Sequence, residues 1–381
     1  MTLAALPAAP LRPARVEAFV FRHPVATPVR TSFGTMHDRP AVFVRVEDAD
    51  GAAGWGEIWC NFPGCGAEHR ARLLETVFAP LATSRGFDGP AQAFAWLTER
   101  TAVLAIQSGE PGPMAQVIAG IDLALWDLCA RRAGQPLWRY LGGTGDEVTA
   151  YASGINPDRP QDVVAAKLDE GYRAFKLKIG FGAERDLENL RTLRALLAPE
   201  AALMVDANQG WTLQQAMDML QPLAEFGLGW LEEPLRADRP WHEWQRLAAA
   251  TRIPLAAGEN VQGLEAFESA MDSKALAVLQ PDLAKWGGIS GCWPVIAAAQ
   301  QRGLRYCPHF LGAGVGLLAS AHVLAAAGGG GILEIDSNPN PLRTDLAGPL
   351  AALRDGRCRL GDAPGIGPAP DLRALAALAV R

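Results

Sequence analysis

The second half of the chain alternates short apolar runs with longer segments in which apolar residues recur at helical spacing. Eight such runs follow Gly143, and we expect each to form a β-strand. Short apolar runs that alternate with helical segments are typical of βα units, which build parallel sheets. The expected strands span residues 148–153, 174–179, 202–207, 229–233, 254–259, 276–282, 304–309 and 331–335.

Eight strands with helices between them favour an α/β fold in which the sheet closes into a barrel. A flat, doubly wound sheet is the competing topology. A nucleotide-binding sheet of that kind would carry a glycine-rich phosphate loop after an early strand. Neither GxGxxG nor GxxxxGK[ST] occurs in this sequence, so the barrel is the preferred prediction.

The first third of the chain has a different pattern. Polar and apolar residues alternate from Arg15 to about Gly56, which predicts antiparallel strands, and the pattern becomes helical from Glu68 to Ala133. We therefore expect four parts. They are a tail (1–14), an α+β capping domain (15–143), a barrel domain that carries the chemistry (144–347), and a C-terminal segment that returns to the first domain (348–381).

Composition and charge narrow the classes of function. The 381 residues are 49% hydrophobic and 20% charged, with a net charge of −6, which is ordinary for a soluble globular protein. The chain has no basic run for nucleic acid or an anionic membrane, and no apolar stretch that we interpret as spanning a bilayer. The first 14 residues do not resemble a signal peptide. Six cysteines without a CxxC pair predict free thiols, and we expect a cytoplasmic protein.

Seven chemically capable side chains close seven of the expected strands, at intervals of 23 to 28 residues. In a parallel barrel the carboxyl ends of all strands open on one face, where active sites are built. These residues should therefore converge on one pocket. They are Lys178, Asp206, Glu232, Glu259, Asp282, His309 and Glu334.

Three of these residues, Asp206, Glu232 and Glu259, indicate a metal site. Carboxylates brought together repel one another unless a cation neutralises them, and oxygen ligands suit Mg²⁺. Zinc is disfavoured because neither His nor Cys accompanies the three acids. Each acid taken alone would more often be a surface or capping residue. Asn208 follows Asp206 by two positions and could bind substrate or a metal-bound water.

Lys176 and Lys178 lie two residues apart on an expected strand, so both side chains should point to the same face. Burial of one ammonium beside another would lower the pKa of both and make an amine usable as a base. Two alternatives stay open. The lysines could be solvated at an exposed strand end, or one of them could form a Schiff base.

Asp282 and His309 end consecutive expected strands, about 4.8 Å apart, so the carboxylate can orient the imidazole and fix its tautomer. Glu334 ends the last expected strand. It could act as a protonated donor to a substrate carboxylate if burial raises its pKa, and a salt-bridged structural glutamate is the alternative.

Taken together, these residues and their order resemble the enolase superfamily, specifically its mandelate racemase subgroup. The similarity extends over nearly the whole chain. The helical segment 119–143 is similar to the family's first signature, and residues 203–234 fit the longer second signature at every fixed spacing. The stretches AFKLKIG, GEN (258–260), PDLAKWGG (281–288) and PH (308–309) complete the set.

This resemblance implies a modified (β/α)7β TIM-type barrel, with an α+β capping domain made from both chain ends and one Mg²⁺ per active site. It implies that Asp206, Glu232 and Glu259 hold the metal. Lys178 and His309 are then acid–base groups on opposite faces of the substrate. The implied supporting roles are contact with the substrate carboxylate by Lys176, pairing with His309 by Asp282, and a hydrogen bond to the enolate by Glu334. The muconate lactonizing subgroup would have a lysine in place of Asp282, so it is set aside.

The common step implied is removal of the proton α to a carboxylate through an enolate. We favour dehydration of an acid sugar to a 2-keto-3-deoxy acid. A racemase or epimerase that uses two bases is the alternative, and a non-catalytic binding protein on the same fold is a second one. The resemblance also implies a small-molecule carboxylate as the partner and a homo-oligomer, either a dimer or an octamer.

Substrate selection is expected to involve loops of the first domain and of the barrel. Arg30 and Asn61, with Thr31, Ser32 and His37, could bind hydroxyl groups, whereas Trp286 and Phe310, with Trp59 and Phe62, could form an apolar pocket. The segment FLGAGVGLLA after His309 is longer than in mandelate racemase, which argues against mandelate as the substrate.

Overall fold

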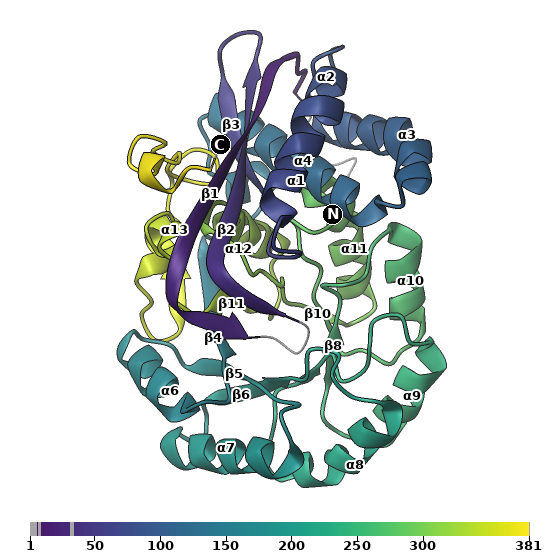
Figure 1. The fold of residues 1–381 in the computed structure, drawn as a ribbon, viewed down its shortest axis with the longest axis vertical. Helices are drawn as coiled ribbons and strands as arrows, with labels where there is room; N and C mark the ends of the chain where they lie inside the picture. Colours follow the sequence, from purple (N-terminus) through teal and green to yellow (C-terminus); the bar gives the residue numbers. More distant parts are fainter. Residues whose placement is uncertain (1–5, 7–8, 31–33, 381) are drawn as a thin grey trace.

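An antiparallel sheet near one end of the molecule faces a ring of parallel strands in the other half (Figure 1). This computed structural model describes residue 6 and residues 9–30 and 34–380, without the side chains of Thr27 and Arg30. The predicted Thr31 and Ser32 therefore lie outside the described residues.

The N-terminal cap (residues 13–30 and 34–140) is an α+β unit. Its sheet has the order β1-β2-β3 with antiparallel pairing, in which Phe19 pairs with Phe43 and Val42 with Ile58. The strands are β1 (Pro13–Arg30), β2 (Thr35–Asp48) and β3 (Ala53–Ile58). Its helical elements are α1 (Gly66–Leu73), the π-helical turn η2 (Leu74–Phe78), α2 (Ala79–Ala82), α3 (Pro90–Ser108), α4 (Pro111–Arg132) and α5 (Leu137–Tyr140).

Helix α4 packs directly on the sheet of the cap. A Cβ atom at Gly56 would lie 2.1 Å from the carbonyl oxygen of Gly120, so glycine is required for this close approach of strand and helix. The helix is long and apolar enough to cross a membrane by composition, but 89% of its apolar window is buried inside the fold. Among the described residues it is the only such helix, and its burial identifies it as a core helix.

The barrel contains all eight predicted strands, most of them shorter than expected. Neighbouring strands pair in parallel in the order β10-β9-β8-β7-β6-β5-β4-β11. Their bounds are β4 (Glu147–Ile155), β5 (Ala174–Lys178), β6 (Ala202–Asp206), β7 (Leu231–Glu232), β8 (Leu255–Ala257), β9 (Val278–Leu279), β10 (Arg305–Tyr306) and β11 (Leu333–Asp336).

One helix follows each of the first seven barrel strands, which confirms the predicted (β/α)7β arrangement. Side chains that point outward from the strands, such as Phe175, Leu177 and Ile179 of β5 and the residue after it, pack in the core against these helices. The helices are α6 (Pro160–Asp169), α7 (Ala183–Leu196), α8 (Leu213–Ala224), α9 (Trp241–Ala249), α10 (Leu264–Asp272), α11 (Gly288–Gln301) and α12 (Gly314–Ala327).

Inward-pointing side chains fill the interior of the ring. A separate buried cluster takes one residue from each strand or its immediate flank, namely Tyr151, Ala174, Met204, Trp230, Ala256, Val278, Cys307 and Ile332. Gly331 adjoins the seam between β10 and β11, where a Cβ atom would lie 2.0 Å from the carbonyl oxygen of Tyr306. The inner cluster and this close approach show that the sheet curls into a packed barrel.

The C-terminal segment runs from the barrel back to the N-terminal cap, as expected. Strand β12 pairs antiparallel with β4, and Val380 N–H donates to the carbonyl of Val20 at 2.9 Å. The elements after β11 are α13 (Pro341–Thr344), η3 (Gly348–Ala351), β12 (Arg357–Arg359) and η4 (Ala376–Leu378). The domain boundaries at residues 143 and 347 stay a prediction.

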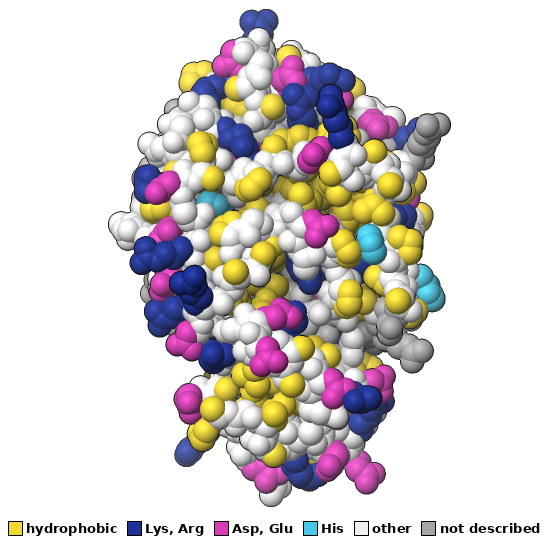
Figure 2. Space-filling view, turned by 90° about the vertical axis from the view of Figure 1, so that its left-hand side faces the viewer, with side chains coloured by type: hydrophobic (Ala, Val, Ile, Leu, Met, Phe, Trp, Pro, Cys, Tyr) yellow, Lys and Arg dark blue, Asp and Glu magenta, His cyan; other side chains and the backbone are white. Residues whose placement is uncertain are grey.

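All six cysteines are free, as predicted, and five of them are buried. On the face shown in Figure 2, basic and acidic side chains are interspersed, without a broad basic area.

Candidate active site

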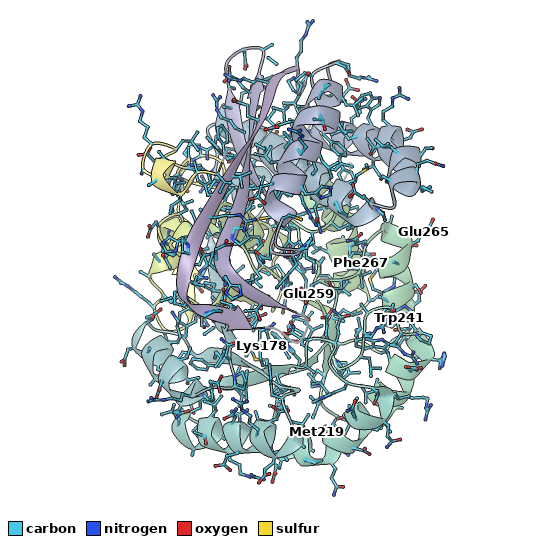
Figure 3. The ribbon with its side chains drawn as sticks, in the orientation of Figure 1. Lys178, Met219, Trp241, Glu259, Glu265 and Phe267 are labelled. Carbon is cyan, nitrogen blue, oxygen red and sulfur yellow. The ribbon has the colours of Figure 1, made fainter. Side chains whose placement is uncertain are left out.

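Strand register brings the first predicted residues together. Lys178 of β5 pairs with Asp206 of β6, and Asp206 pairs with Glu232 of β7. Since all three end their strands, their side chains enter the barrel mouth at the same level. Figure 3 shows Lys178 and Glu259 near the lower end of the long strands β1 and β2.

Lys176 is the buried cation at the base of the site. Its ammonium lies 2.5 Å from a carboxylate oxygen of Glu232, 2.9 Å from Glu334 and 4.0 Å from Asp206. Burial acts to lower the pKa of Lys176, but the carboxylates of Glu232 and Glu334 outweigh it and raise the pKa well above its ordinary value. The predicted lowering of this pKa was wrong, because the nearest charges are acids and not Lys178.

Glu232 is held from three sides. Besides Lys176, the indole N–H of Trp230 donates to its Oε2 at 2.9 Å and the amide of Gln280 donates at 2.7 Å. Burial raises the pKa of Glu232 to about 7, against the opposing effect of Lys176. Asp206 accepts hydrogen bonds from the backbone and side-chain amides of Asn208, at 2.7 and 2.9 Å, and the oxygen of that side chain accepts from Lys178.

Glu259 pairs with two cations, whereas the neighbouring Glu233 pairs with an amide. Glu259 accepts from the ammonium of Lys285 at 3.2 Å and from Nε2 of His309 at 2.9 Å. Burial acts to raise the pKa of Glu259, but His309 and Lys285 hold it well below its usual value. Glu233 accepts from Asn260, and burial together with the charges of Glu259 and Asp206 raises its pKa well above the ordinary value.

The predicted Asp282–His309 pair is formed. Nδ1 of His309 lies 2.7 Å from Oδ2 of Asp282, and Asp282 is itself fixed by the backbone N–H groups of Ala284 and Lys285. Burial acts to lower the pKa of His309, but Glu259, Glu334 and Asp282 raise it well above its usual value. A carboxylate at each ring nitrogen favours the imidazolium form of His309.

Glu334 is ionised rather than protonated. It accepts from Lys176, from the hydroxyl of Ser153, and from the backbone N–H of Phe310 at 3.1 Å. Burial acts to raise the pKa of Glu334, but Lys176 and His309 lower it below its usual value. The hypothesis of a neutral donor was wrong for this arrangement, since the cations stabilise the carboxylate more than burial destabilises it.

The charges suit a divalent cation. Counted in their ionised forms, six carboxylates (Asp206, Glu232, Glu233, Glu259, Asp282 and Glu334) face four cations (Lys176, Lys178, Lys285 and His309), which is a formal excess of two negative charges. Burial raises the pKa of Glu233, and the nearby negative charges of Glu259 and Asp206 add to that effect. Over the described part of the chain, however, no three acidic, His or Cys side chains stand ready to hold an ion. Glu232 and Glu259 would have to turn away from Lys176 and His309 to reach a shared ion. The three acids therefore fit a metal by their chemistry and their positions at the strand ends, but their present side-chain orientations do not form the site.

These side chains surround a cavity of about 270 Å³. Its size is at the small end for ligand pockets, which suits a small acid. Most of its lining residues carry charged or amide groups, and Val29, Trp59, Phe62 and Leu311 form an apolar part. The remaining lining residues are Ser153, Gly154, Lys178, Asp206, Asn208, Gln209, Glu259, Asn260, Lys285, His309, Glu334, Asp336 and Asn338.

Several predicted specificity residues do not line this cavity. Trp286 packs against Phe267, with ring centroids 5.5 Å apart, and Phe310 is buried beside Gly312 and Gly316. Both rings are more stable in the apolar core than in a charged pocket. Asn61 is buried and donates to the carbonyl of Leu311, so it fixes the pocket wall. The side chain of Arg30 is not among those described, and His37 is exposed.

Sequence reasoning missed several polar residues that line the cavity, namely Ser153, Lys285, Gln209, Asn260, Asp336 and Asn338. Ser153 ends the first barrel strand, so the rule of one polar residue per strand end could have found it. Lys285 follows Asp282 by three positions, and its ammonium lies 4.8 Å from the ring centre of Trp59 and 2.8 Å from Asn260. A lysine inside an otherwise apolar segment was the available signal.

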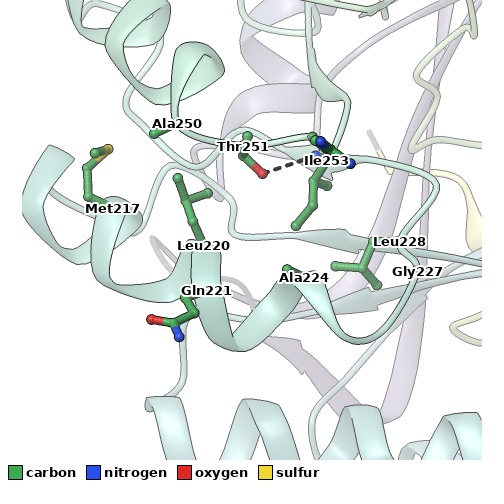
Figure 4. A pocket seen from close by; sticks show the side chains of 10 residues that line it. Met217, Leu220, Gln221, Ala224, Gly227, Leu228, Ala250, Thr251 and Ile253 are labelled. Carbon is green, nitrogen blue, oxygen red and sulfur yellow. Dashed lines mark hydrogen bonds between the residues drawn. The ribbon is translucent and has the colours of Figure 1, made fainter.

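A second groove, of about 610 Å³, lies between α8 and the loop that follows α9 (Figure 4). Its walls come from mainly apolar residues such as Met217, Leu220 and Ile253, and it has no carboxylate and no histidine. It therefore lacks the chemistry of the first cavity.

Two family models match the chain. Residues 15–142 match the mandelate racemase/muconate lactonizing enzyme N-terminal domain, and residues 161–374 match the enolase C-terminal domain-like model.

Two curated relatives are similar over most of their length. A D-galactarolactone cycloisomerase of Agrobacterium fabrum is 32% identical over 369 residues, which cover 92% of this chain and 94% of that protein. An arabinonate dehydratase of Saccharolobus solfataricus is 27% identical over 338 residues, with 87% and 88% covered.

Two solved structures share the fold. A mandelate racemase/muconate lactonizing enzyme from Bordetella bronchiseptica RB50 has 62% identity and a TM-score of 0.93, over 97% of this chain and 100% of that one. A racemase from Streptomyces coelicolor A3(2) with bound magnesium has 28% identity and a TM-score of 0.85, with 97% and 100% covered.

Proposed function

The chain belongs to the mandelate racemase/muconate lactonizing enzyme family of the enolase superfamily, and on that premise we propose that it removes the proton α to the carboxylate of a small acid. The overall reaction proposed is dehydration of an acid sugar to a 2-keto-3-deoxy acid, in the cytoplasm and in a homo-oligomer. The named relatives that act on sugar-derived acids support this choice.

One observation carries the proposal. Lys178 and His309 both line the small cavity, and they stand on different sides of the barrel ring, with β4 and β11 between them. A substrate carboxylate held at the base of the cavity would present its α-carbon to one group on each side. General acid–base catalysis needs such groups within hydrogen-bond reach of the reacting atoms.

Asp206, Glu232 and Glu259 would hold one Mg²⁺. The racemase of the same fold that was solved with bound magnesium supports this choice of ion. When bound, the ion would supply electrostatic stabilisation of the negative charge that develops on the substrate carboxylate. The excess of negative charge in the site supports a divalent ion.

The residues of the chain have separate tasks in this proposal. The ammonium of Lys176 would bind a substrate carboxylate oxygen, and Glu334 with Ser153 would hold that ammonium in place. Asp282 keeps a proton on Nδ1 of His309, so that Nε2 can exchange a proton with substrate once Glu259 turns to the metal. Nζ of Lys178 would act from the other side, next to Asn208.

A racemase or epimerase is the second candidate. It is favoured by the same pair of groups, since a proton removed by one could be returned by the other. A substrate with a β-hydroxyl would lose water instead, with His309 or Lys178 as the general acid. A protein that binds acids without turnover is a third candidate, for which the complete set of acid–base groups has no obvious use.

The experiment is solvent deuterium exchange at the α-carbon of aldonates, aldarates and 2-hydroxy acids, with Mg²⁺ and with a chelator. Formation of a 2-keto acid would support dehydration, and exchange with inversion would support racemisation. Exchange that persists in the chelator would contradict the role given to the metal. No exchange with any acid would contradict the enzyme proposal and favour a binding protein. Lys178→Ala and His309→Asn should each abolish exchange on one face only.

A further inference from the structure

Two buried acids of the N-terminal cap bind the start of two barrel helices. Glu57, in β3, accepts hydrogen bonds from the backbone N–H groups of Ala313 at 2.6 Å and Gly316 at 2.8 Å, at the start of α12. Asp122, in α4, accepts from the N–H groups of Ile289 at 2.7 Å and Ser290 at 2.9 Å, and from the Ser290 hydroxyl at 2.5 Å, at the start of α11. A carboxylate at these positions satisfies donors that a helix leaves unpaired and complements the helix dipole.

These two helices follow the loops that carry one half of the proposed chemistry. The loop between β9 and α11 contains Asp282 and Lys285, and the loop between β10 and α12 contains His309 and Leu311. Asn61, also in the cap, donates to the carbonyl of Leu311 at 2.6 Å.

The segment FLGAGVG (310–316) is shaped for this contact. A Cβ atom at Gly316 would lie 2.4 Å from the Phe310 ring and 3.4 Å from Oε2 of Glu57. At Gly312, a Cβ would lie 2.6 Å from Oε1 of Glu57. The glycines therefore let the ring and the carboxylate reach the first turn of α12.

The opposite side of the site is supported differently. Lys178, Asp206 and Asn208 lead into α7 and α8, which pack mainly on neighbouring barrel helices and lie at the end of the molecule away from the cap (Figure 1). The cap contacts concentrate on α11 and α12.

We propose that Glu57 and Asp122 are positioning residues that fix the Asp282–His309 side of the site to the N-terminal cap, while the Lys178 side is set by the barrel. This inference rests on the proposed function for its catalytic meaning, since it assigns the two carboxylates to one of the two proton-transfer faces.

Isosteric variants test the proposal. Glu57→Gln and Asp122→Asn each replace one accepting oxygen by an NH₂ group that faces backbone donors. The matched control is Asp127→Asn. Asp127 is a buried acid of the same helix α4, but it accepts from Trp55 N–H, Ile366 N–H and Arg131, which lie in the cap and the C-terminal segment. Burial raises the pKa of Glu57 and of Asp122 to about 7, so the assays are run at a pH above 8, where both are ionised.

The first readout needs no substrate. Amide hydrogen exchange, followed by mass spectrometry, should speed up about tenfold in peptides that cover residues 310–317 for Glu57→Gln, and in peptides that cover 287–291 for Asp122→Asn. Asp127→Asn should leave both peptides unchanged. The proposal would be overturned if amide exchange became equally fast in the control, or if it did not become faster in the two variants.

The second readout is α-proton exchange by the full-length protein with an acid that the wild type accepts. Glu57→Gln should slow exchange on the His309 face by about tenfold and leave the Lys178 face within about twofold. An equal loss on both faces would overturn the positioning role, because a general loss of structure acts on both. If the wild type exchanges no acid at all, the proposed function fails, and the amide-exchange result alone decides whether the cap fixes these loops.

Discussion

Replacement of Lys176 by methionine should destabilise the metal-free protein far more than the same change at Lys178. The Lys176 side chain is 2% exposed, and its ammonium pairs with Glu232 at 2.5 Å and Glu334 at 2.9 Å. Removal of one partner from a buried ion pair costs about 3–5 kcal/mol, because the charge left behind has no compensation.

The expected shift in melting temperature follows from chain length. With 381 residues and about 2.1 cal/mol/K of unfolding entropy per residue, the total is about 0.8 kcal/mol/K. A loss of 3–5 kcal/mol therefore lowers the melting temperature by about 4–6 °C. Lys178 is 12% exposed and 3.7 Å from Asp206, so Lys178→Met should lower it by less than about 2 °C.

Thermal unfolding followed by circular dichroism, with a chelator and then with excess Mg²⁺, measures both effects. Magnesium should reduce the difference in melting temperature between Lys176→Met and the wild type, because in the wild type the ion competes with the Lys176 ammonium for Glu232. The account of the charge balance would be refuted if both lysine variants lost the same number of degrees in melting temperature. It would also be refuted if magnesium did not change the difference between Lys176→Met and the wild type.

Three further outcomes are expected. Asp282→Asn should reduce exchange on the His309 face by about 10–100-fold, because the imidazole loses the carboxylate that orients it, and α-proton exchange measures this. His322→Asn should remove one pH dependence of the free energy of unfolding. Burial lowers the pKa of His322 to about 3, whereas its value in the unfolded chain is about 6.5. The wild type therefore loses stability as the pH falls below 6.5. Between pH 7.5 and 5 the wild type should lose about 2 kcal/mol more than the variant in urea unfolding. Gly56→Ala should cost at least about 3 kcal/mol, since its Cβ would lie 2.1 Å from a carbonyl oxygen of α4.

Each of these predictions has a control or a contrary result. In His322→Asn the side-chain oxygen can replace Nδ1 as acceptor for the Trp138 N–H, so the variant can keep this hydrogen bond but has no group that titrates. Equal pH dependence in both proteins would mean that His322 is not buried in its neutral form. Gly64→Ala places its methyl group in open space and should be neutral. If Asp282→Asn slowed α-proton exchange equally on both faces of the substrate, Asp282 would have a role in folding only.

Much of the fold followed from the sequence because the signals are local and repeated. Each barrel strand is an apolar run that a polar residue or a loop ends, and the alternation of side chains along β5 places Lys176 and Lys178 on one face without reference to the rest of the molecule. The nearly even spacing of the polar residues reports the length of a βα unit. The convergence of Asp206 and Glu232 followed from this period, since parallel strands end at one edge.

The tertiary structure alone decided the protonation state of each site residue and which loop side chains line the pocket. Lys176 is strongly basic and Glu334 is ionised because the two meet at 2.9 Å, although 158 positions separate them in the chain. Phe310 lies in the core and not in the pocket, because its ring packs beside Gly312 and Gly316, where a side chain would occupy its place. Protonation and packing depend on the sum of all charges and volumes around a side chain. That sum exists only once distant segments are brought together, so no local pattern can contain it.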